Sequence, residues 1–137
     1  NIQGGQTYGE IYNKLFISID NLRSNTKIDL VDKKNLVFKV EVEMDSRLLE
    51  TTNYLDLGKS ANMKFIEKKI NKEMESQIKK LLVFFQKNQV DPVGIGNEYM
   101  AHVRGKPISQ DDWKEIYKDA KFDVQVKNTL TKTGTMD

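Results

Sequence analysis

His102 is the only histidine of the chain, which makes it the first residue to test as a general base. Glu98 lies four residues earlier, on the same face of a predicted helix, where it would pair with the imidazole or orient it. Nucleophilic catalysis would also need a serine in a recognisable nucleophile motif, and the sequence has none. The pattern favours a surface histidine, and we expect His102→Ala to change stability by less than about 0.5 kcal/mol.

Gly94-Ile95-Gly96 is similar to the first part of a dinucleotide-binding fingerprint. The third glycine of that fingerprint is replaced by Tyr99, and no predicted strand precedes the motif. A phosphate-binding loop would continue with lysine and serine or threonine, but here Asn97-Glu98 follow. Proline and glycine within residues 91–96 suffice for a tight reversal between two helices. We therefore predict a turn at this motif, and we expect no nucleotide or other cofactor.

Two acidic pairs have spacings that suit metal binding or glycoside chemistry: Asp111 with Asp112, and Glu41 with Glu43. The first pair lies in the first turn of a predicted helix capped by Ser109, where the helix dipole favours negative charge. The second pair lies on the polar face of a predicted strand. The absence of cysteine excludes disulfides, zinc ribbons and thiol catalysis. We expect no catalytic, cofactor-binding or metal-binding residue, and hence no enzyme.

The composition indicates one folded domain. The chain has 137 residues, of which 38% are hydrophobic and 31% charged. Lysine and arginine total 22 against 20 acidic residues, and this near balance argues against nucleic acid as the partner. The longest apolar run, Leu81 to Phe85, is far shorter than the roughly 20 residues that cross a bilayer. Because the chain starts at Asn1 without a signal peptide, we expect it to be a piece of a longer protein.

Residues 60–89 show the strongest periodicity and predict one long amphipathic helix, with Ser60 as its N-cap. Apolar residues recur in steps of three or four, at Met63, Ile66, Ile70, Met74, Ile78, Leu81, Leu82 and Phe85. The opposite face carries Glu67, Lys68, Asn71, Lys72, Glu75 and Lys79. Such a one-sided helix must pack on a flat apolar surface. Val83 and Phe84 fall outside the stripe, so either the helix end is buried on two sides or an apolar patch is left for a partner.

Alternation of apolar and polar residues predicts strands before and after the helices. The clearest strand is residues 36–44, with Leu36, Phe38, Val40, Val42 and Met44 on one face. An earlier strand is predicted as two pieces, 13–20 and 26–31, joined by a kink or bulge at 23–25 and followed by a turn at 32–35. Residues 45–59 are predicted to be less regular. The closing strand is residues 122–130, in which Phe122, Val124 and Val126 alternate with polar residues.

Two shorter helices are predicted between the long helix and the closing strand. The first spans residues 95–104 and ends at Gly105 and Pro107. Its inward residues are Ile95, Tyr99, Met100 and Val103. The second follows Ser109 and carries the apolar stripe Trp113, Ile116, Tyr117 and Ala120. Trp113 is amphipathic enough to anchor a ligand, but its place in that stripe favours the core.

The order β-β-α-α-α-β predicts an α+β two-layer sandwich, in which an antiparallel sheet is covered on one face by the long helix and two shorter helices. We expect a linker over residues 1–10, a single domain over residues 11–131 and a polar tail over residues 132–137. The core between sheet and helix predicts that Ile70→Asp or Val40→Asp unfolds the domain.

The ordered set of motifs resembles the C-terminal domain of the C subunits of spore nutrient germinant receptors, the GerAC type. The resemblance covers nearly the whole chain and is strongest over residues 63–134. It is carried by Lys87 to Gly96 at the end of the long helix, the short helix to Arg104, Pro107, Trp113, the closing strand with Gly134 after it, and Arg47 to Glu50 before the helical half. Relatives often have two tryptophans around the third helix, where this chain has only Trp113.

The resemblance implies a lipoprotein subunit at the outer face of the spore inner membrane, alongside integral-membrane A and B subunits. It implies attachment through an N-terminal lipidated cysteine, which this sequence does not contain. It also implies no enzymatic activity, and it assigns no site residue to a position of this chain. The favoured function is therefore receptor assembly or signalling during spore germination. The alternative is a soluble domain that senses a small-molecule nutrient in an enclosed pocket. An enzyme with His102 as its base is the third hypothesis.

Overall fold

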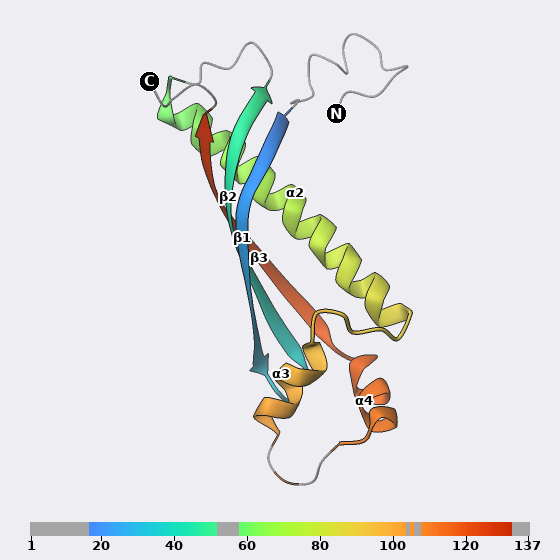
Figure 1. The fold of residues 1–137 in the computed structure, drawn as a ribbon. Coiled ribbons are helices and arrows are strands. Elements are labelled where there is room, and N and C mark those ends of the chain that lie inside the picture. The colour runs from blue at the N-terminus through green and yellow to red at the C-terminus, as the bar shows by residue number, and fades with distance from the viewer. Residues whose placement is uncertain (1–16, 52–57, 104, 106–107, 133–137) are drawn as a thin grey trace.

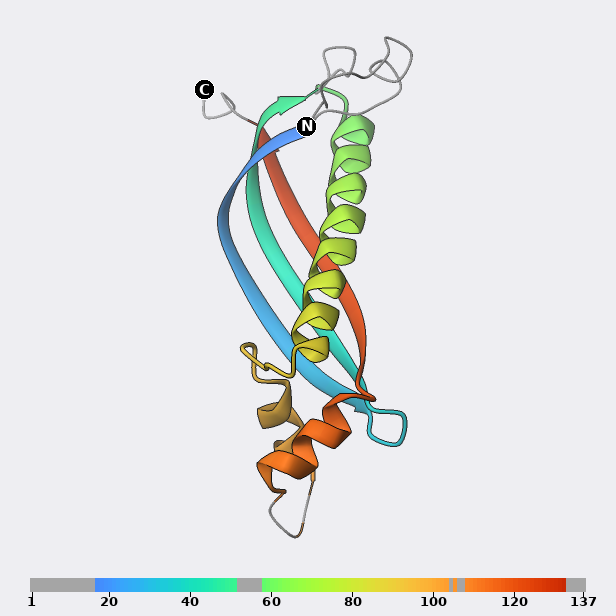
Figure 2. The ribbon, with the colours of Figure 1, turned by 90° about the vertical axis from the view of Figure 1, so that its right-hand side faces the viewer.

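The computed structural model describes residues 17–51, 58–103, 105 and 108–132. The elements follow the predicted order (Figure 1) and comprise β1 (Ile17–Asp32), β2 (Val37–Thr51), α2 (Ser60–Lys87), α3 (Ile95–His102), α4 (Gln110–Tyr117) and β3 (Lys121–Lys132). The three long strands curve around α2, while α3 and α4 lie at the end of the molecule where α2 ends (Figure 2). The α+β class and the layer of helices on one side of a sheet are confirmed. The predicted linker over residues 1–10 lies outside the described residues.

The sheet is mixed, which corrects the prediction of an antiparallel sheet. Its strand order is β1-β2-β3; β1 pairs with β2 in antiparallel orientation, whereas β3 runs parallel to β2 from the pair Val37–Lys121 to the pair Leu48–Lys132. The reason lies in the connection. Because α2 carries the chain back along the sheet, β3 starts at the end where β2 starts, as in other strand–helix–strand units.

The first two strands are longer than predicted. β1 is one strand of 16 residues, and a register shift between Asn21 and Arg23 forms a bulge close to the predicted kink. β2 continues to Thr51, so the first part of the segment expected to be irregular belongs to the sheet. Leu36 has φ 56° and lies in the turn rather than in the strand. Leu15 and Phe16, predicted in the first strand, lie outside the described residues.

One face of the sheet is buried against α2, α3 and α4. On β2 the predicted inward residues from Phe38 to Met44 are buried, and the same alternation continues through Ser46 and Leu48. The core has two apolar clusters, one with Phe38 and Val40 and one with Leu48 and Ile70, and Met74 packs against both. Ser46 and the β3 residue Asn128 lie on this face between the clusters, and their buried side-chain N and O atoms have no hydrogen-bond partner among the described residues.

α2 contacts the sheet through residues four apart, as predicted from the apolar stripe. Ile66, Ile70 and Leu82 are buried, and Met74 and Ile78 pack against the apolar clusters. We call Ile66, Ile70, Met74, Ile78 and Leu82 the core column of α2. Leu81 is 50% exposed, so its predicted place in the core is wrong: it lies one position before the column, on the side that faces β1. Ser60 is the first helical residue and Lys59 the N-cap without a side-chain hydrogen bond, which corrects the predicted cap.

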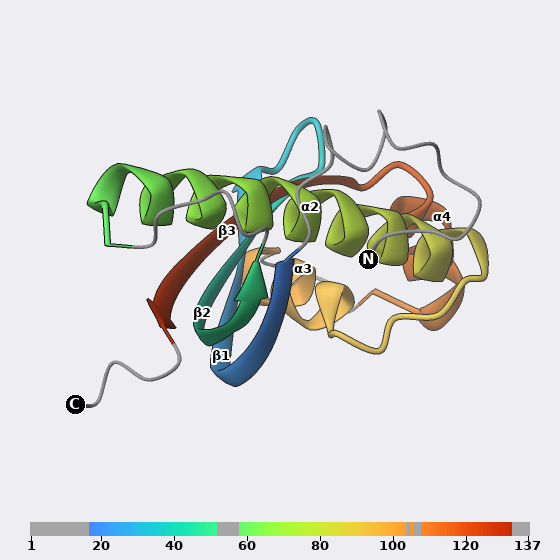
Figure 3. The ribbon, with the colours of Figure 1, turned by 90° about the horizontal axis from the view of Figure 1, so that it is seen from above.

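The flank of α2 that faces β3 carries three polar side chains that accept hydrogen bonds from the strand backbone. Glu67 Oε2 accepts from the N–H of Leu130 at 2.9 Å, Asn71 Oδ1 from that of Asn128 at 3.0 Å, and Glu75 Oε2 from that of Val126 at 3.0 Å. We call Glu67, Asn71 and Glu75 the edge ladder. Four helical residues and two strand residues each advance the chain by about 6–7 Å, so the two sets stay in step. Figure 3 shows α2 lying nearest β3 and farthest from β1.

The edge ladder corrects the interpretation of these residues as part of a solvated face. β3 is an edge strand whose outward N–H groups would otherwise be open to another strand. Side chains from α2 satisfy three of them, and α2 itself covers this edge of the sheet. The opposite edge is formed by β1, which pairs with β2 alone among the described residues.

Candidate functional site

The predicted turn after α2 is held by the carboxylate of Asp91. Its Oδ1 accepts from the N–H of Ile95 at 2.8 Å, and its Oδ2 accepts from the N–H of Gly96 at 2.7 Å. These are the first N–H groups of α3, the ones that a phosphate would need in a nucleotide-binding loop. Gly94 has φ 81°, a left-handed conformation that glycine adopts without strain. Asp91 therefore takes the place of an external anion, in agreement with the prediction of a structural turn.

Gly96 brings α3 against α4. A Cβ atom at this position would lie 3.0 Å from Cε2 and Nε1 of Trp113 and 3.1 Å from Asp91 Oδ2. The indole of Trp113 is in turn stacked on the ring of Tyr117, with centroids 5.2 Å apart, and contacts Tyr99 at 5.5 Å. Trp113 is thus part of the packing between α3 and α4, as its place in the apolar stripe predicted.

We expect Gly96→Ala to destabilise the protein by about 1–3 kcal/mol, the usual cost of overpacking a tight contact. The added methyl group would push Trp113 away from α3 or displace the Asp91 carboxylate. Equilibrium unfolding in urea measures the loss. Ala101→Val enlarges an exposed residue of the same helix and should stay within about 0.5 kcal/mol of the parent chain. Equal stability of the two variants would contradict the close packing at Gly96.

The Tyr117 hydroxyl donates to the carbonyl oxygen of Val90 at 2.7 Å and so ties α4 to the end of α2. Gln86 reinforces this junction, since its Nε2 donates to the carbonyl oxygens of Tyr117 at 2.7 Å and Ala120 at 2.8 Å. Burial, assisted by the negative charge of Asp91, raises the pKa of Tyr117 to about 12. The junction is built from part-buried groups that satisfy one another's hydrogen bonds, as is typical of a structural contact.

The raised pKa of Tyr117 predicts a loss of stability at high pH. In the unfolded chain the phenol ionises near pH 10, at about its ordinary value, whereas in the folded chain its pKa is about 12. The contribution of the neutral phenol is therefore fully present below about pH 10 and is lost as pH rises toward about 12. Unfolding titrations at several pH values in this window measure the slope. Tyr117→Phe should flatten it, and an unchanged slope in that variant would assign the effect to another group.

His102 lies on the exposed side of α3, as predicted. Its Nδ1 is 3.1 Å from Glu98 Oε2 and 3.0 Å from the Glu98 carbonyl oxygen. The same carboxylate oxygen of Glu98 accepts from the N–H of Leu30 at 3.1 Å, so it fastens α3 to the end of β1. Glu98 is thereby assigned a structural role that the sequence did not indicate. The near-neutral effect expected of His102→Ala stays a prediction, to be checked by thermal melting.

The other sequence candidates are also explained by local structure. Ser109 caps α4 by accepting from the N–H of Asp112 at 3.1 Å, and Asp111 and Asp112 occupy the first turn. Met100 is 42% exposed, which corrects its predicted inward place. The residues of α3 that contact the core are Ile95 at its start and Tyr99. Within the described ranges no three His, Cys, Asp or Glu side chains converge on a position that would hold a metal ion. None of the described helices is both long and apolar enough to cross a bilayer.

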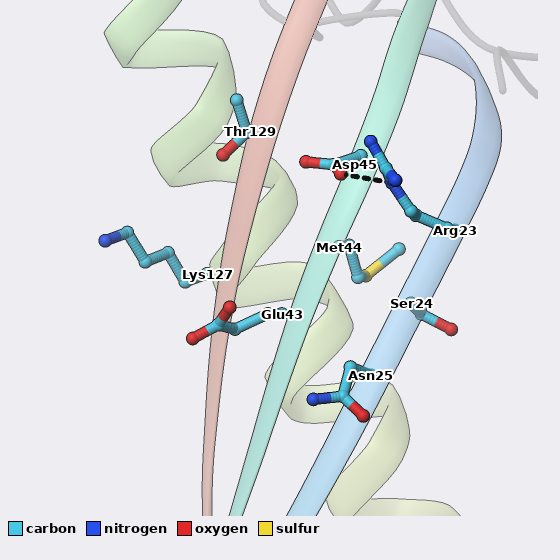
Figure 4. A pocket seen from close by; sticks show the side chains of 8 residues that line it. All are labelled: Arg23, Ser24, Asn25, Glu43, Met44, Asp45, Lys127 and Thr129. Carbon is cyan, nitrogen blue, oxygen red and sulfur yellow. Dashed lines mark hydrogen bonds and ion pairs between the residues drawn. The ribbon is translucent and has the colours of Figure 1, made fainter.

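A polar hollow of about 310 Å³ lies on the sheet face opposite α2 and crosses all three strands (Figure 4). Asp45 accepts from Arg23 Nε at 2.8 Å along one side of it. Glu43 and Lys127 are neighbours in the β2–β3 register, and neither forms an ion pair with a described residue. Glu43 was predicted only as part of a polar strand face. The bulge of β1 beside Arg23 helps to shape this hollow, and the sequence pattern did not indicate it.

A largely apolar groove runs between β1 and α2 on the other face of the sheet, with Lys69, Glu73 and Gln77 of α2 along its first stretch. It has two adjoining stretches of about 390 and 260 Å³, both bordered by Met74. Leu81 and Val93, which is 46% exposed, lie along the second stretch. Other apolar side chains that line the groove are Ile17, Ile19, Ile28, Ile78 and Phe85. The groove exists because α2 lies over the β3 side of the sheet, and no other helix of the described residues covers β1 before its end at α3.

The open question about Val83 and Phe84 is resolved by their exposure. Val83 packs partly against the larger apolar cluster, whereas Phe84 is 59% exposed on the outer side of α2. Phe84 and Val83 line a hollow together with three lysines of α2. The end of the helix is thus not buried on two sides, and the apolar patch is the correct alternative.

Comparison with known proteins identifies the family. The family model described as "Spore germination B3/ GerAC like, C-terminal" matches residues 2–134. The chain is 28% identical over 123 residues to the spore germination protein GerQC of Bacillus cereus, a match that covers 89% of this chain and 34% of that protein. The crystal structure of the GerBC protein has the same fold, with a TM-score of 0.63 and 19% identity over 85% of this chain and 40% of that one.

The chain therefore spans about a third of the curated relative and two fifths of the solved chain, at 34% and 40% of their lengths. The match to nearly all described elements agrees with the resemblance that the motifs at residues 87–96, Trp113 and the closing strand carry. The chain belongs to the GerAC-like family, as a C-terminal domain of a spore germinant receptor C subunit.

Proposed function

We propose that the domain is a non-enzymatic part of a germinant receptor and acts in receptor assembly or signalling during spore germination. Its partners would be the A and B membrane subunits, and a lipid anchor elsewhere in the full-length protein would hold it at the spore inner membrane. The family supports a receptor with several subunits. The proposal depends above all on one observation, the apolar groove between β1 and α2 beside the edge of β1, which pairs with no further strand among the described residues.

A groove of this kind suits an extended strand of another receptor subunit. Such a strand would pair with the outward N–H and C=O groups of β1 and place alternate side chains on the apolar surface of the groove. The same pairing is blocked at the other edge of the sheet, because α2 and the edge ladder already cover the outer edge of β3. Leu81 and Val93 would lose their solvent exposure on assembly, which favours binding through apolar burial.

Site-specific photo-cross-linking in the full-length protein tests this assembly surface. A photoreactive residue in place of Leu81 or Val93, in the groove, is expected to cross-link to another receptor subunit in spore membranes. The same residue in place of Val31 or Leu49, which are also about half exposed but lie on the other face of the sheet, is the matched control. Equal cross-linking at all four positions, or none at the groove positions, would argue against the groove as the assembly surface.

Substitution gives the functional counterpart of the same test. Leu81→Arg with Val93→Arg should slow germination and reduce recovery of the A and B subunits with the domain. Val31→Arg with Leu49→Arg should leave both unchanged. Circular dichroism of the isolated chain establishes that the substitutions leave the fold intact. Normal germination by the groove variant, with its fold retained, would count against assembly through this surface.

Direct sensing of a small-molecule nutrient is the second candidate function. The polar hollow in Figure 4 favours it, because Glu43 and Lys127 offer one carboxylate and one ammonium group to a zwitterion. An NMR titration with amino acids and sugars should then shift the resonances of residues that line the hollow. Glu43→Gln should abolish those shifts and Glu41→Gln, elsewhere on the same strand, should not. A titration that moves no resonance would dispose of direct sensing.

A further inference from the structure

The outer side of α2 is a cationic surface that lies mostly outside the groove and the edge ladder. Of the lysines of α2, Lys69 alone also borders the groove, at its first stretch. All seven lysines of the helix are exposed, and we call them the lysine face: Lys64, Lys68, Lys69, Lys72, Lys79, Lys80 and Lys87. Lys68 and Lys72 each lie two positions after a residue of the core column, which puts them on the side directed away from the sheet. None of the seven forms an ion pair with a described residue.

The charge of the protein is unevenly divided between this helix and the rest of the chain. α2 has seven lysines against three glutamates, a formal charge of +4. Since the whole chain has a charge of +2, all its other residues together carry −2. Two of the three glutamates, Glu67 and Glu75, are turned to the edge of β3 and accept its N–H groups. On the exposed surface of α2 only Glu73 opposes the lysines.

Apolar side chains lie among these lysines. Near the end of α2, Val83 and Phe84 form an open hollow of about 520 Å³ that is bordered by Lys79, Lys80 and Lys87. At the other end Phe65 is 45% exposed, and the Lys69 ammonium lies 5.6 Å from the centre of its ring. An aromatic side chain surrounded by ammonium groups is typical of helices that lie at a lipid–water interface.

We propose that the lysine face of α2 docks on an anionic lipid bilayer, with Phe84 entering the headgroup region. The charge complementarity is direct, because the lysines face outward without opposing carboxylates apart from Glu73. A phospholipid presents apolar carbon next to its phosphate, and the hollow at Phe84 presents apolar surface next to three ammonium groups. An acidic protein would satisfy the lysines but would leave the exposed aromatic ring without an apolar environment. The inference goes beyond receptor assembly, because Phe84 and the three lysines around it lie outside the groove.

Vesicle co-sedimentation of the chain tests the proposal. We expect binding to phosphatidylcholine vesicles in which about one lipid in three is the anionic phosphatidylglycerol. Binding to vesicles of phosphatidylcholine alone should be much weaker. Each lysine near an anionic surface contributes about a fivefold gain in affinity, so Lys79→Gln, Lys80→Gln and Lys87→Gln together should weaken binding about a hundredfold. Phe84→Ser should also weaken it. Raising the salt concentration should weaken binding by the parent chain, because the lipid charges are screened.

The matched control removes three other exposed lysines, Lys33, Lys34 and Lys114, which lie in the β1–β2 turn and in α4. This variant has the same net charge as the α2 variant and should bind like the parent chain to within a few-fold. Circular dichroism melts establish that each variant is folded. Equal loss of binding in the two triple variants, equal binding to neutral and anionic vesicles, or no binding by the parent chain would overturn the proposal. Receptor assembly would still be tested separately, since its cross-linking positions lie in the groove.

Discussion

Val40→Asp is expected to leave the chain unfolded at room temperature. Val40 is 3% exposed in the larger apolar cluster, on the sheet face that the helices cover. An aspartate there would be a buried carboxylate without a partner, which costs several kcal/mol. Domains of this size are stable by about 5–15 kcal/mol in total. Ile70→Asp should have the same result from the helix side, because Ile70 is 6% exposed in the core column. Far-ultraviolet circular dichroism and a thermal melt measure both.

Two controls separate burial from the mere addition of charge. Val31→Asp makes the same replacement in β1 at a residue that is 55% exposed, and Leu81→Asp adds a carboxylate to α2 outside the core column. Both variants should remain folded and melt within a few degrees of the parent chain, as surface substitutions usually do. A folded Val40→Asp variant with a normal melting temperature would be incompatible with the two-layer core.

Removal of the edge ladder is the second change with a large expected effect. Glu67→Ala, Asn71→Ala and Glu75→Ala together would leave three backbone N–H groups of β3 without acceptors. A hydrogen bond to a charged acceptor contributes about 1.5–3 kcal/mol and one to a neutral acceptor about 1 kcal/mol. We expect the triple variant to lose about 4–7 kcal/mol of stability in urea unfolding, and less if water replaces the side chains as acceptors. It should also aggregate more readily, because an edge strand becomes accessible.

The control for this variant uses the same helix and the same spacing. Lys64→Ala, Lys68→Ala and Lys72→Ala replace three exposed residues that are four apart, and alanine favours a helix at least as well as lysine. The control should therefore stay within about 0.5 kcal/mol of the parent chain. If both triple variants lost the same stability, the hydrogen bonds to β3 would not be the cause. Glu67→Gln with Glu75→Gln retains acceptor oxygens and should fall between the two.

Periodicity predicted the elements of this fold because each one buries a single face. Apolar residues recur every three or four positions in α2 and at every second position from Phe38 to Met44, because those are the positions on the buried face. Local chemistry predicted the cap of α4, since Ser109 lies where a helix start needs an acceptor. The turn at residues 91–96 followed from proline and glycine. Its anchor Asp91 was missed, although an aspartate just before a helix start is itself a capping signal.

The remaining features depend on partners that are distant in the sequence. Glu67 and Leu130 are 63 residues apart, and nothing local to α2 distinguishes a glutamate that faces water from one that faces a strand edge. The sequence does contain a weak indication of this contact. Glu67, Asn71 and Glu75 follow one another at a spacing of four residues, so one side of the helix carries hydrogen-bond acceptors without a lysine between them. The parallel pairing of β3 likewise depends on where α2, α3 and α4 deliver the chain, and alternation along a strand does not report its direction.

The core column and the edge ladder both repeat every four residues along α2. An inserted or deleted residue in this helix is therefore expected to disturb the fold more than a substitution on its outer side. One inserted residue rotates everything after it by about 100° around the helix axis. An insertion after Asn71 would bring Glu73 and Gln77 to the positions from which Met74 and Ile78 contact the sheet. It would move Met74 to the position from which Glu75 accepts the N–H of Val126, and Ile78 to the exposed position of Lys79. Single substitutions on the outer side change only local chemistry. Relatives of this protein are therefore expected to vary in sequence mainly at the positions of α2 outside the core column and the edge ladder, while insertions and deletions collect in the connections on either side of the helix.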